Sequence, residues 1–394
     1  MKYLRQIKNL TGKRVLMRVD FNVGFNKEGK IEPEDAIKIE RTLPTIKYLV
    51  KKKAKIILIA HLGRPEGQRV KELRLDGVAE YVSQSLKKTI TKLDDVLGLT
   101  VARQVSKMKN GQIILLENIR FEIGEEINSP VLAKELAKLG DIYVNEAFGV
   151  SHRKAASVCA ITKYLPSYAG LLLEQEIKAM DYVLKKPKKP VVVIMGGLKF
   201  ETKLPVIKKL LPKADQVLLG GGLSSTVLAA LGYTVGSSKI GKDYFSEAKK
   251  VGQNKKVFLP LDVVAGRKDS SDYRNCLVEK KTKEVCLGDL AIYDIGPNTI
   301  RAWSEIIKKA NTIIWNGPMG FFEQPPFDKG SLSLAYLVGA RSKGPSYGIV
   351  GGGETLAVLA RSQMTQYVDH ISTGGGAMLE YLSGKKLPGL QSLK

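Results

Sequence analysis

Residues 190–205 read PVVVIMGGLKFETKLP, and this stretch decides the fold class. The apolar run before Gly196 is typical of a strand that is buried on both faces, as in a parallel sheet. Two glycines then lead into Lys199 and Lys203. On a helix, a spacing of four residues places both side chains on one face, about 6 Å apart along the axis, where like charges repel each other. A shared anion would remove that cost, so the stretch predicts a strand, a glycine turn and a helix that faces an anion.

The same pattern recurs along the chain, with short Ile, Val and Leu runs that alternate with amphipathic stretches of helical length. Because 394 residues exceed what one hydrophobic core usually serves, we expect two domains. Buried strands separated by helices predict an α/β protein with doubly wound parallel sheets. The expected strands lie within 14–20, 55–61, 112–118 and 141–146 in the first half, and within 190–197, 216–222, 312–318 and 347–353 in the second.

Composition limits the possible partners and surroundings. No apolar run approaches the ~20 residues of a membrane span, and the N-terminus carries charges where a signal peptide needs an apolar stretch, so we expect a cytoplasmic protein. The three cysteines form no close pair and histidines are few, which argues against disulfides and a structural zinc site. The net charge of +24 comes from scattered lysines and arginines, which favours a solvated basic surface that attracts small anions.

The residues that follow each expected strand differ between the two halves. Ligands of such sheets bind beyond the carboxyl ends of the strands. In the first half these ends carry polar and cationic groups, which together predict a socket for a small anion: Asp20, Asn22, His61, Arg64, Arg120, His152 and Arg153. In the second half they carry glycines, which let backbone N–H groups approach a phosphate and predict a nucleotide site: Gly196, Gly197, Gly220 to Gly222, Gly317, Gly320 and Gly351 to Gly353.

Two other classes of protein stay open at this point. A dinucleotide-dependent oxidoreductase would need a G-x-G-x-x-G fingerprint, which is absent. A nucleic-acid-binding protein would be retained on DNA or RNA with a steep salt dependence. Residues 236–243, GSSKIGKD, match the spacing of a P-loop but end in Asp243 where a magnesium-binding hydroxyl is needed, so we interpret them as a surface loop.

The motifs, taken in order, resemble those of the phosphoglycerate kinase family. They are RVDFNV, HLGRP, ENIRFEIGEE, NEAFGVSHRKAAS, GGLKFETKLPVI, DIGPNT, WNGPMGFFE, GGGET and STGGGAMLEYLSGKKLPG, and they span essentially the whole chain. The resemblance implies two Rossmann-like domains joined by a hinge helix. It also implies reversible phosphoryl transfer from 1,3-bisphosphoglycerate to MgADP, which gives 3-phosphoglycerate and MgATP. The implied protein is a monomer with no membrane partner and no specific nucleic-acid partner. The implied domains are 1–168 for phosphoglycerate, a hinge at 169–186, 187–372 for the nucleotide, and a segment 373–394 that returns to the N-terminal domain.

The resemblance also implies roles for individual residues. Lys199 and Lys203 would contact the nucleotide phosphates and the migrating group, and Gly352 and Gly375 would lie on the transfer path. Phosphoglycerate would be held by Asp20, Asn22, Lys38, His61, Arg64, Arg120 and Arg153. The nucleotide would be held by Gly196, Gly197, Lys199, Lys203, Gly220, Gly221, Asn316, Pro318, Glu323, Gly351, Gly352, Gly353, Glu354 and Thr355.

Three positions depart from the family pattern. Glu354 stands where the family has the aspartate that binds magnesium, and Glu146 replaces another aspartate that we interpret as structural. Alignment on LPTI places Lys38 where the family has a transition-state arginine. Lys38 itself, Arg41 or another cation could supply that charge, and we favour Lys38 because it holds the aligned position.

Overall fold

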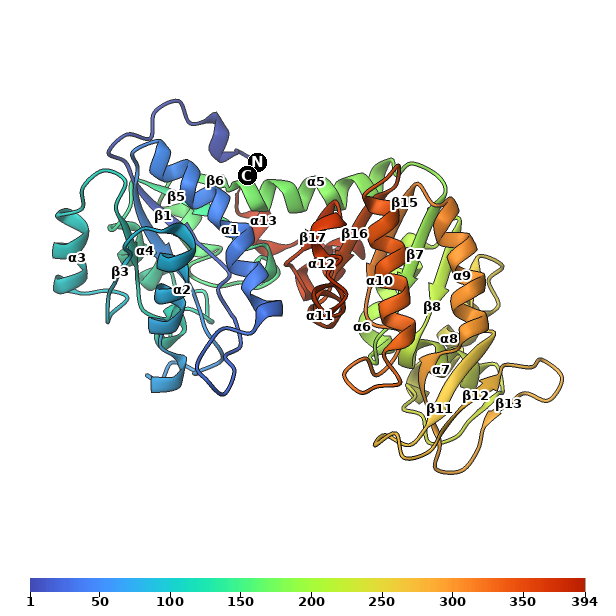
Figure 1. The fold of residues 1–394 in the computed structure, drawn as a ribbon. Helices are drawn as coiled ribbons and strands as arrows, with labels where there is room; N and C mark the ends of the chain where they lie inside the picture. Colours follow the sequence, from blue (N-terminus) through green and yellow to red (C-terminus); the bar gives the residue numbers. More distant parts are fainter. Residues whose placement is uncertain (394) are drawn as a thin grey trace. The chain divides into compact units, whose positions relative to one another are not determined.

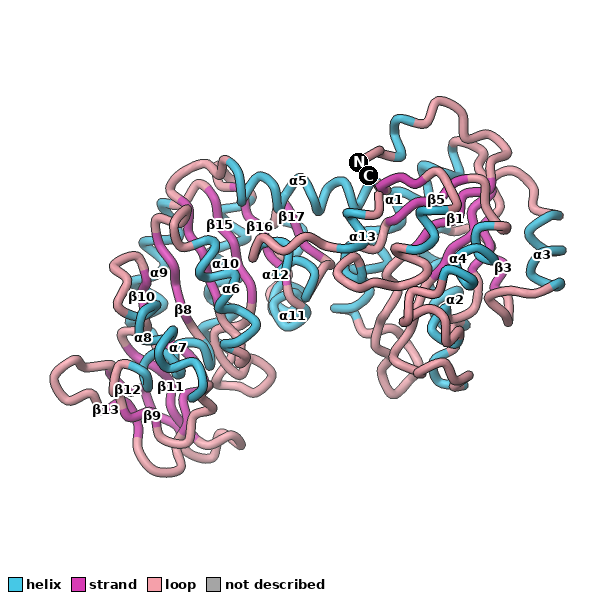
Figure 2. The backbone as a smooth tube through the Cα atoms, turned by 180° about the vertical axis from the view of Figure 1, so that it is seen from behind, coloured by secondary structure: helices cyan, strands magenta, loops and turns pink. Residues whose placement is uncertain are grey.

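The computed structural model describes residues 1–393, which form two compact units (Figure 1). The first unit contains residues 1–178 and 376–381 and the end of the chain from Lys385; the second contains residues 179–375 and 382–384. No helix within residues 1–393 combines the length and the apolar character needed to cross a membrane. In each unit the six-stranded sheet lies in the interior with helices around it (Figure 2).

The first unit is built on a six-stranded sheet in which every neighbouring pair is parallel, in the order β3-β4-β2-β1-β5-β6. The central strands are almost fully buried, as expected for a sheet covered on both faces. The strands are β1 (Arg14–Arg18), β2 (Lys55–Ile59), β3 (Thr91–Lys92), β4 (Ile113–Leu115), β5 (Ile142–Asn145) and β6 (Ser167–Ala169).

Helices connect these strands and bury their apolar faces against the sheet. In α1, the residues Ile39, Leu43, Ile46 and Leu49 recur at helical spacing and join the core below β1 and β2. The helices are α1 (Pro33–Lys51), α2 (Asp76–Leu86), α3 (Leu99–Ser106), α4 (Pro130–Ala137) and α5 (Leu171–Lys185), with α12 (Gly376–Leu382) and α13 (Pro388–Gln391) near the end of the chain.

The second unit repeats this architecture with the order β10-β8-β7-β15-β16-β17, again parallel throughout. Its strands are β7 (Val191–Met195), β8 (Gln216–Leu219), β10 (Val257–Phe258), β15 (Thr312–Asn316), β16 (Tyr347–Gly351) and β17 (His370–Ser372). Its helices are α6 (Phe200–Leu210), α7 (Gly221–Ala230), α8 (Phe245–Gly252), α9 (Pro297–Lys309), α10 (Lys329–Ser342) and α11 (Gly353–Arg361).

Two small sheets in the second unit were not predicted from the sequence. One is antiparallel, in the order β12-β11-β14, and the other pairs β13 with β9 (Figure 1). The strand β12 is mostly exposed and lacks the continuous apolar run that marks the buried strands. These strands are β9 (Thr234–Val235), β11 (Asp262–Gly266), β12 (Tyr273–Leu277), β13 (Glu284–Cys286) and β14 (Ala291–Ile295).

The eight expected strands are all present, and the prediction of an α/β protein with doubly wound parallel sheets is confirmed. The additional sheet strands β3, β6, β10 and β17 are only two or three residues long and lie at or near the sheet edges. The expected helix after residue 168 is α5.

The strand order places a topological switch point in each unit. In the first unit the chain winds outward from β1 through β2 and then passes to β5 on the other side of β1; in the second unit the same reversal separates β7 from β15. Crevices form at the carboxyl ends of strands where the winding reverses, because the connections depart in opposite directions. The sites described next lie at these two points.

Candidate functional site

A cavity of about 250 Å³ lies at the carboxyl edge of the first unit's sheet. All seven residues predicted from the strand ends as the anion socket line it: Asp20, Asn22, His61, Arg64, Arg120, His152 and Arg153. Gly63, Gly149 and Val150 also line it. Because these residues follow four different strands, only the parallel sheet brings them together.

His61 is buried and contributes a neutral donor to this cavity. Burial lowers the pKa of His61 well below its usual value, and the charges of Arg18, Arg120, Arg153 and Lys38 act in the same direction. His61 Nδ1 lies 3.1 Å from Arg18 Nη2. A guanidinium can only donate, so Nδ1 must accept, and the ring proton is assigned to Nε2. His61 can therefore donate Nε2–H to a ligand oxygen.

The arginines of the cavity are held in place by other groups. Arg120 Nη1 donates to Gly63 O at 2.6 Å, and Gly63 N–H in turn donates to Asn22 Oδ1 at 2.8 Å. Glu126 lies between two of the cations, 3.4 Å from Arg120 Nη2 and 3.8 Å from Arg153 Nη1. These contacts leave guanidinium donors for an anion while fixing their direction.

Lys38 lies beside this cavity, on α1. Its Nζ donates to Asn22 O at 2.9 Å and to Asp35 Oδ1 at 2.6 Å. Its charge also contributes to the lowered pKa of His61. Arg41, three residues further along α1, instead directs Nη2 toward Gln175 Oε1 at 3.4 Å on α5. Of these two cations, Lys38 is therefore the one that is placed next to the socket residues.

In the second unit, glycines form the floor of the switch point. Gly196 N–H donates to Asn316 O at 3.0 Å, and Gly197 N–H donates to Pro318 O at 2.8 Å, so the chain after β7 lies directly against the chain after β15. A Cβ atom at Gly196 would lie 2.0 Å from Pro318 O, and one at Gly220 would lie 2.5 Å from Met319 Sδ. Gly221 has φ +58° and the same close surroundings. Gly196 and Gly221 are required because backbone packs against backbone there, whereas a Cβ at Gly220 would meet the side chain of Met319.

Lys199 and Lys203 occupy different positions at the start of α6. Lys199 is the exposed N-cap residue, whereas Lys203 lies in the second turn and is half-buried. Burial lowers the pKa of Lys203 to about 8, and the charge of Glu354 opposes that shift. Glu354 belongs to the first turn of α11 and is exposed. Both helices begin at the carboxyl edge of the sheet, where their first N–H groups are free to bind an anion.

Other predicted residues are buried beside this edge and make hydrogen bonds to its backbone. Asn316 and Thr355 are buried: Asn316 Nδ2 donates to Gly351 O at 2.7 Å, and Thr355 Oγ1 accepts from Gly317 N–H at 2.7 Å. Gly352 has φ +99° at the N-cap of α11, and a Cβ at Gly353 would meet no atom within 4 Å. Gly375 has φ +48° and equally open surroundings.

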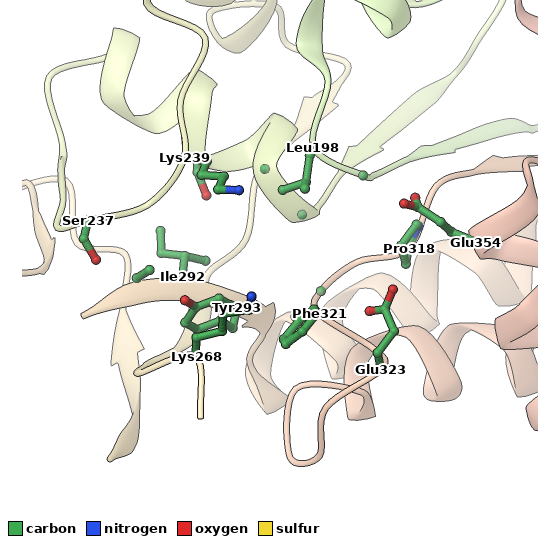
Figure 3. Close-up of a pocket in the computed structure, with 16 residues that line it drawn as sticks. Leu198, Ser237, Lys239, Lys268, Ile292, Tyr293, Pro318, Phe321, Glu323 and Glu354 are labelled. Atoms are coloured by element: carbon green, nitrogen blue, oxygen red, sulfur yellow. The ribbon is translucent and has the colours of Figure 1, made fainter. Parts of the chain in front are cut away.

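A larger cavity of about 430 Å³ extends from this edge (Figure 3). The predicted nucleotide residues that line it are Gly197, Gly221, Gly222, Pro318, Gly320, Glu323 and Glu354. The sequence reasoning missed Ser225, Lys268, Tyr293 and Phe321 among the other lining residues, together with Ser237 and Lys239. The last two belong to GSSKIGKD, which is an exposed loop as predicted but also forms part of the cavity wall. Phe321 lies in the motif WNGPMGFFE, but no quoted family motif contains the other five positions.

The two units thus offer complementary chemistry. The first provides a compact cationic socket with donors from His61, Arg64, Arg120 and Arg153. The second provides a cavity lined by glycine backbone and the carboxylate of Glu354, and the half-buried Lys203 interacts electrostatically with that carboxylate. Such groups can bind and neutralise phosphates, and no nucleophile–base pair is needed for a reaction that only moves a phosphoryl group.

Comparison with known proteins agrees with this geometry. The family model described as phosphoglycerate kinase matches residues 4–385. The phosphoglycerate kinase of Dictyoglomus turgidum is 45% identical over 393 residues, and that of Thermosipho africanus is 43% identical over 393 residues; each alignment covers 98% of this chain and 96% of the relative.

Solved structures give the same result. The phosphoglycerate kinase of Coxiella burnetii is 37% identical with a TM-score of 0.83, and it covers 99% of this chain and 98% of its own. The enzyme of Pyrococcus horikoshii OT3 is 30% identical with a TM-score of 0.87, and it covers 100% of this chain and 98% of its own. On its sequence, its two parallel-sheet units and these matches, the chain belongs to the phosphoglycerate kinase family.

Proposed function

We propose that the protein transfers a phosphoryl group reversibly between 1,3-bisphosphoglycerate and MgADP, with 3-phosphoglycerate and MgATP as products. One observation carries the proposal: a cationic socket lies at the switch point of one parallel sheet, and a glycine-floored cavity lies at the switch point of the other. Phosphoglycerate is assigned to the first and the nucleotide to the second. The predicted domain boundaries at 168, 186 and 372 belong to this proposal.

To catalyse this reaction, the protein needs mainly to position the two substrates and to neutralise the charge of the phosphoryl group. In the ATP-forming direction the acyl phosphate is already an activated donor, and in reverse the attacking carboxylate needs no base. The phosphoryl group in flight carries charge on its oxygens, which cationic side chains and backbone N–H groups stabilise when held in fixed positions. Water must be kept away from it, because water would intercept the group.

In the first unit, the phosphate of phosphoglycerate accepts hydrogen bonds from Arg64, Arg120, Arg153 and neutral His61. The hydroxyl of phosphoglycerate donates to Asp20 and Asn22. Lys38, already beside Asn22, supplies positive charge to the transferring group. This assignment follows the geometry of α1, because Arg41 is engaged with Gln175.

In the second unit, Lys199 and Lys203 neutralise the nucleotide phosphates, with the free N–H groups of α6 and α11 beside them. Lys203 sits in a partly desolvated position, where a charge interacts more strongly with phosphate than it does in water. The glycines Gly196, Gly197, Gly220, Gly221 and Gly351 to Gly353 let the phosphates approach the backbone. Gly375 is assigned to the transfer path, Glu323 to the nucleotide at the cavity wall, and Asn316, Pro318 and Thr355 to support of the pocket.

Magnesium fits this second site through Glu354. Its carboxylate makes no hydrogen bond or ion pair with any residue of 1–393 and lines the cavity, so an oxygen ligand is free where the phosphates are placed. Mg²⁺ is usually bound by one or two carboxylates together with substrate phosphates. Glu354 would hold the ion, which would supply positive charge to the phosphates. The chain's own contribution is that carboxylate and the nearby Lys203.

A coupled assay with 3-phosphoglycerate, ATP and Mg²⁺ tests the proposal. Lys203→Ala should lose activity by about 10²-fold or more while the fold persists, since a positioned cation at a transferring phosphate contributes on that scale. Lys242→Ala in the loop 236–243 is the matched control, because Lys242 does not line the cavity and should behave as the parent. Comparable losses in the two variants would contradict the assignment. We also propose a cytoplasmic monomer, which sedimentation equilibrium checks for oligomeric state.

A further inference from the structure

Asn118 lies close to the cationic socket of the first unit without lining it. It comes three residues after the end of β4 and is fully buried. The residues that line the socket do not include it, although its second neighbour along the chain, Arg120, does line the socket. Any effect of Asn118 on a bound ligand must therefore pass through other residues.

The side-chain amide of Asn118 makes four hydrogen bonds, all of them to backbone groups. Its Oδ1 accepts from Leu62 N–H at 3.2 Å and from Arg120 N–H at 3.1 Å. Its Nδ2 donates to Leu62 O at 2.8 Å and to Leu73 O at 2.9 Å. An amide has two acceptor sites on oxygen and two hydrogens on nitrogen, so the hydrogen-bonding capacity of this side chain is fully used.

These bonds join the two loops that carry most of the phosphate donors. Leu62 follows His61 directly and precedes Arg64 by two residues, and both of its backbone polar groups are paired with the amide of Asn118. The backbone of Arg120 is bonded to the same amide. Asn118 thereby fixes the segment of His61 and Arg64 relative to the segment of Arg120.

The socket needs such a connection because its cations repel each other. Burial lowers the pKa of Arg120, and the nearby charge of Arg153 lowers it further. Like charges held this close move apart unless the backbone that carries them is fixed. A carboxylate that held these guanidinium groups would compete with a phosphate for the same donors. The neutral amide of Asn118 bonds only to backbone, so it leaves the charge of the arginines to the ligand.

We propose that Asn118 is a positioning residue for the first substrate. Its amide clamps the loop of His61 and Arg64 to the loop of Arg120, and it thereby presets the spacing of the donors that hold the phosphate of phosphoglycerate. This inference rests on the proposed function. Preset donors bind and orient a ligand without the cost of ordering them at each binding event.

The alternative role for Asn118 is local. It is the N-cap residue of the 3-10 helix η3 (Ile119–Phe121), and its bond with Arg120 N–H is the capping bond. A residue that only caps this helix would not need the other three bonds, which go to Leu62 and Leu73. Variants that separate these two sets of bonds therefore separate the two roles.

Calorimetric titration with 3-phosphoglycerate alone and with MgADP alone tests the clamp in the full chain. Asn118→Leu keeps a side chain of similar length and removes all four hydrogen bonds. We expect the Kd for 3-phosphoglycerate to rise about tenfold or more, because misplacement of binding groups by about 1 Å can cost up to about 10²-fold. The Kd for MgADP, which is assigned to the second unit, should stay within about twofold of the parent value. Unchanged binding of 3-phosphoglycerate, or equal weakening of both ligands, overturns the proposal.

Asn118→Ser distinguishes the clamp from the cap. Serine is as good an N-cap residue as asparagine, but it has no amide to pair with both backbone groups of Leu62. This variant should also bind 3-phosphoglycerate about fivefold or more weakly, with unchanged binding of MgADP. It carries the test by itself if Asn118→Leu does not fold. Parent-like binding of 3-phosphoglycerate by Asn118→Ser would show that Asn118 is only a cap.

Val82→Ala controls for a general loss of stability. Val82 is a fully buried residue of α2 in the same unit and does not line the socket. Its truncation should lower the melting temperature and leave both Kd values unchanged. If it weakens 3-phosphoglycerate as much as the Asn118 variants do, the positioning role is overturned. A parent without activity in the coupled assay would refute the proposed function, whereas an active parent with normal 3-phosphoglycerate binding in Asn118→Leu would refute only the role of Asn118.

Discussion

At the scale of single residues, neighbouring cations on one helix have different hydrogen-bond partners. Lys38 and Arg41 are three residues apart on α1, yet Lys38 donates to Asn22 O beside the cationic socket and Arg41 donates to Gln175 Oε1. A lysine is a point charge, whereas arginine presents a planar fork that grips two oxygens. In the proposed reaction, Lys38 would therefore neutralise the transferring group but fix its orientation less firmly than an arginine would.

Substitution of these two residues tests their roles. Lys38→Ala should lower turnover by about 10³-fold, as loss of a transition-state cation in phosphoryl transfer does. Lys38→Arg should retain or increase activity, and Arg41→Ala should have a small effect. Steady-state turnover with saturating ATP and 3-phosphoglycerate measures all three. Near-normal activity of Lys38→Ala together with a crippled Arg41→Ala enzyme would transfer the role to Arg41.

The lowered pKa of Lys203 predicts a dependence of activity on pH. Burial brings this pKa to about 8, so the ammonium of the free enzyme loses its proton as the pH rises through that value. We expect kcat/KM for the nucleotide to fall above about pH 8, and Lys203→Arg to move this limb upward because guanidinium stays charged. The pH profiles of the two proteins decide the matter. Coincident alkaline limbs would assign the limb to another group.

Lys203 also makes the free energy of unfolding depend on pH, in a direction that follows from its pKa. The pKa of Lys203 in the fold, about 8, lies below its ordinary value of 10.5. Between these values the unfolded chain binds more protons than the folded chain, so this group makes the free energy of unfolding rise with pH from about 8 to 10.5. Placement of the charge is thus costly to the fold at neutral pH, as is common for groups that bind phosphate.

At the scale of elements, buried carboxylates join strands to helices. Glu146 follows β5, and its carboxylate accepts hydrogen bonds from Leu172 N–H at 2.9 Å, from Leu173 N–H at 3.3 Å and from the hydroxyl of Thr45. It thereby satisfies free N–H groups of the first turn of α5. A Cβ at Gly170 would lie 1.8 Å from Glu146 Oε2, which explains the glycine before the helix. These contacts agree with the structural role predicted for Glu146.

Burial raises the pKa of Glu146 to about 7, although its hydrogen bonds act against this shift. Because the folded-state pKa exceeds the ordinary value of 4.5, the stabilisation from this group is complete below about pH 4.5 and is lost as the pH rises through 7. Glu146→Gln, which cannot ionise, should therefore melt about 2–6 °C higher than the parent at pH 8, with a smaller difference at pH 5.

Calorimetry at the two pH values measures this difference in melting temperature. Glu135→Gln is the control, because Glu135 is an exposed residue of the same unit that pairs only with Lys138 on the surface. It should shift the melting temperature equally little at both pH values. A Glu146→Gln protein whose melting temperature relative to the parent does not change with pH would contradict the raised pKa.

At the scale of the whole molecule, each substrate is assigned to a different unit, so reaction requires the two bound substrates to meet. We expect binding of both ligands to contract the molecule by closure about residues 170–186, which include α5. Small-angle scattering should show a smaller radius of gyration with 3-phosphoglycerate and a nucleotide together than without ligands. Unchanged scattering at saturating concentrations of both would count against closure.

The sequence alone determined the eight long buried strands, the two doubly wound sheets and the residues at their carboxyl ends. It could do so because a strand covered on both faces must be a continuous apolar run, and because parallel strands bring their ends to one edge. His61, Arg64, Arg120 and Arg153 were predicted on this ground and line one cavity. The glycines after β7 and β8 were predicted in the same way.

Only the tertiary structure decided the remainder of the site. Ser225, Lys239 and Lys268 lie at ordinary positions of a helix and two loops, and nothing local marks a serine whose hydroxyl lacks a partner. The different directions of Lys38 and Arg41, and the desolvation of Lys203, also depend on which distant segments pack against each side chain. Periodicity records what each element must bury, whereas the partners of a polar side chain are chosen by segments far away in the chain.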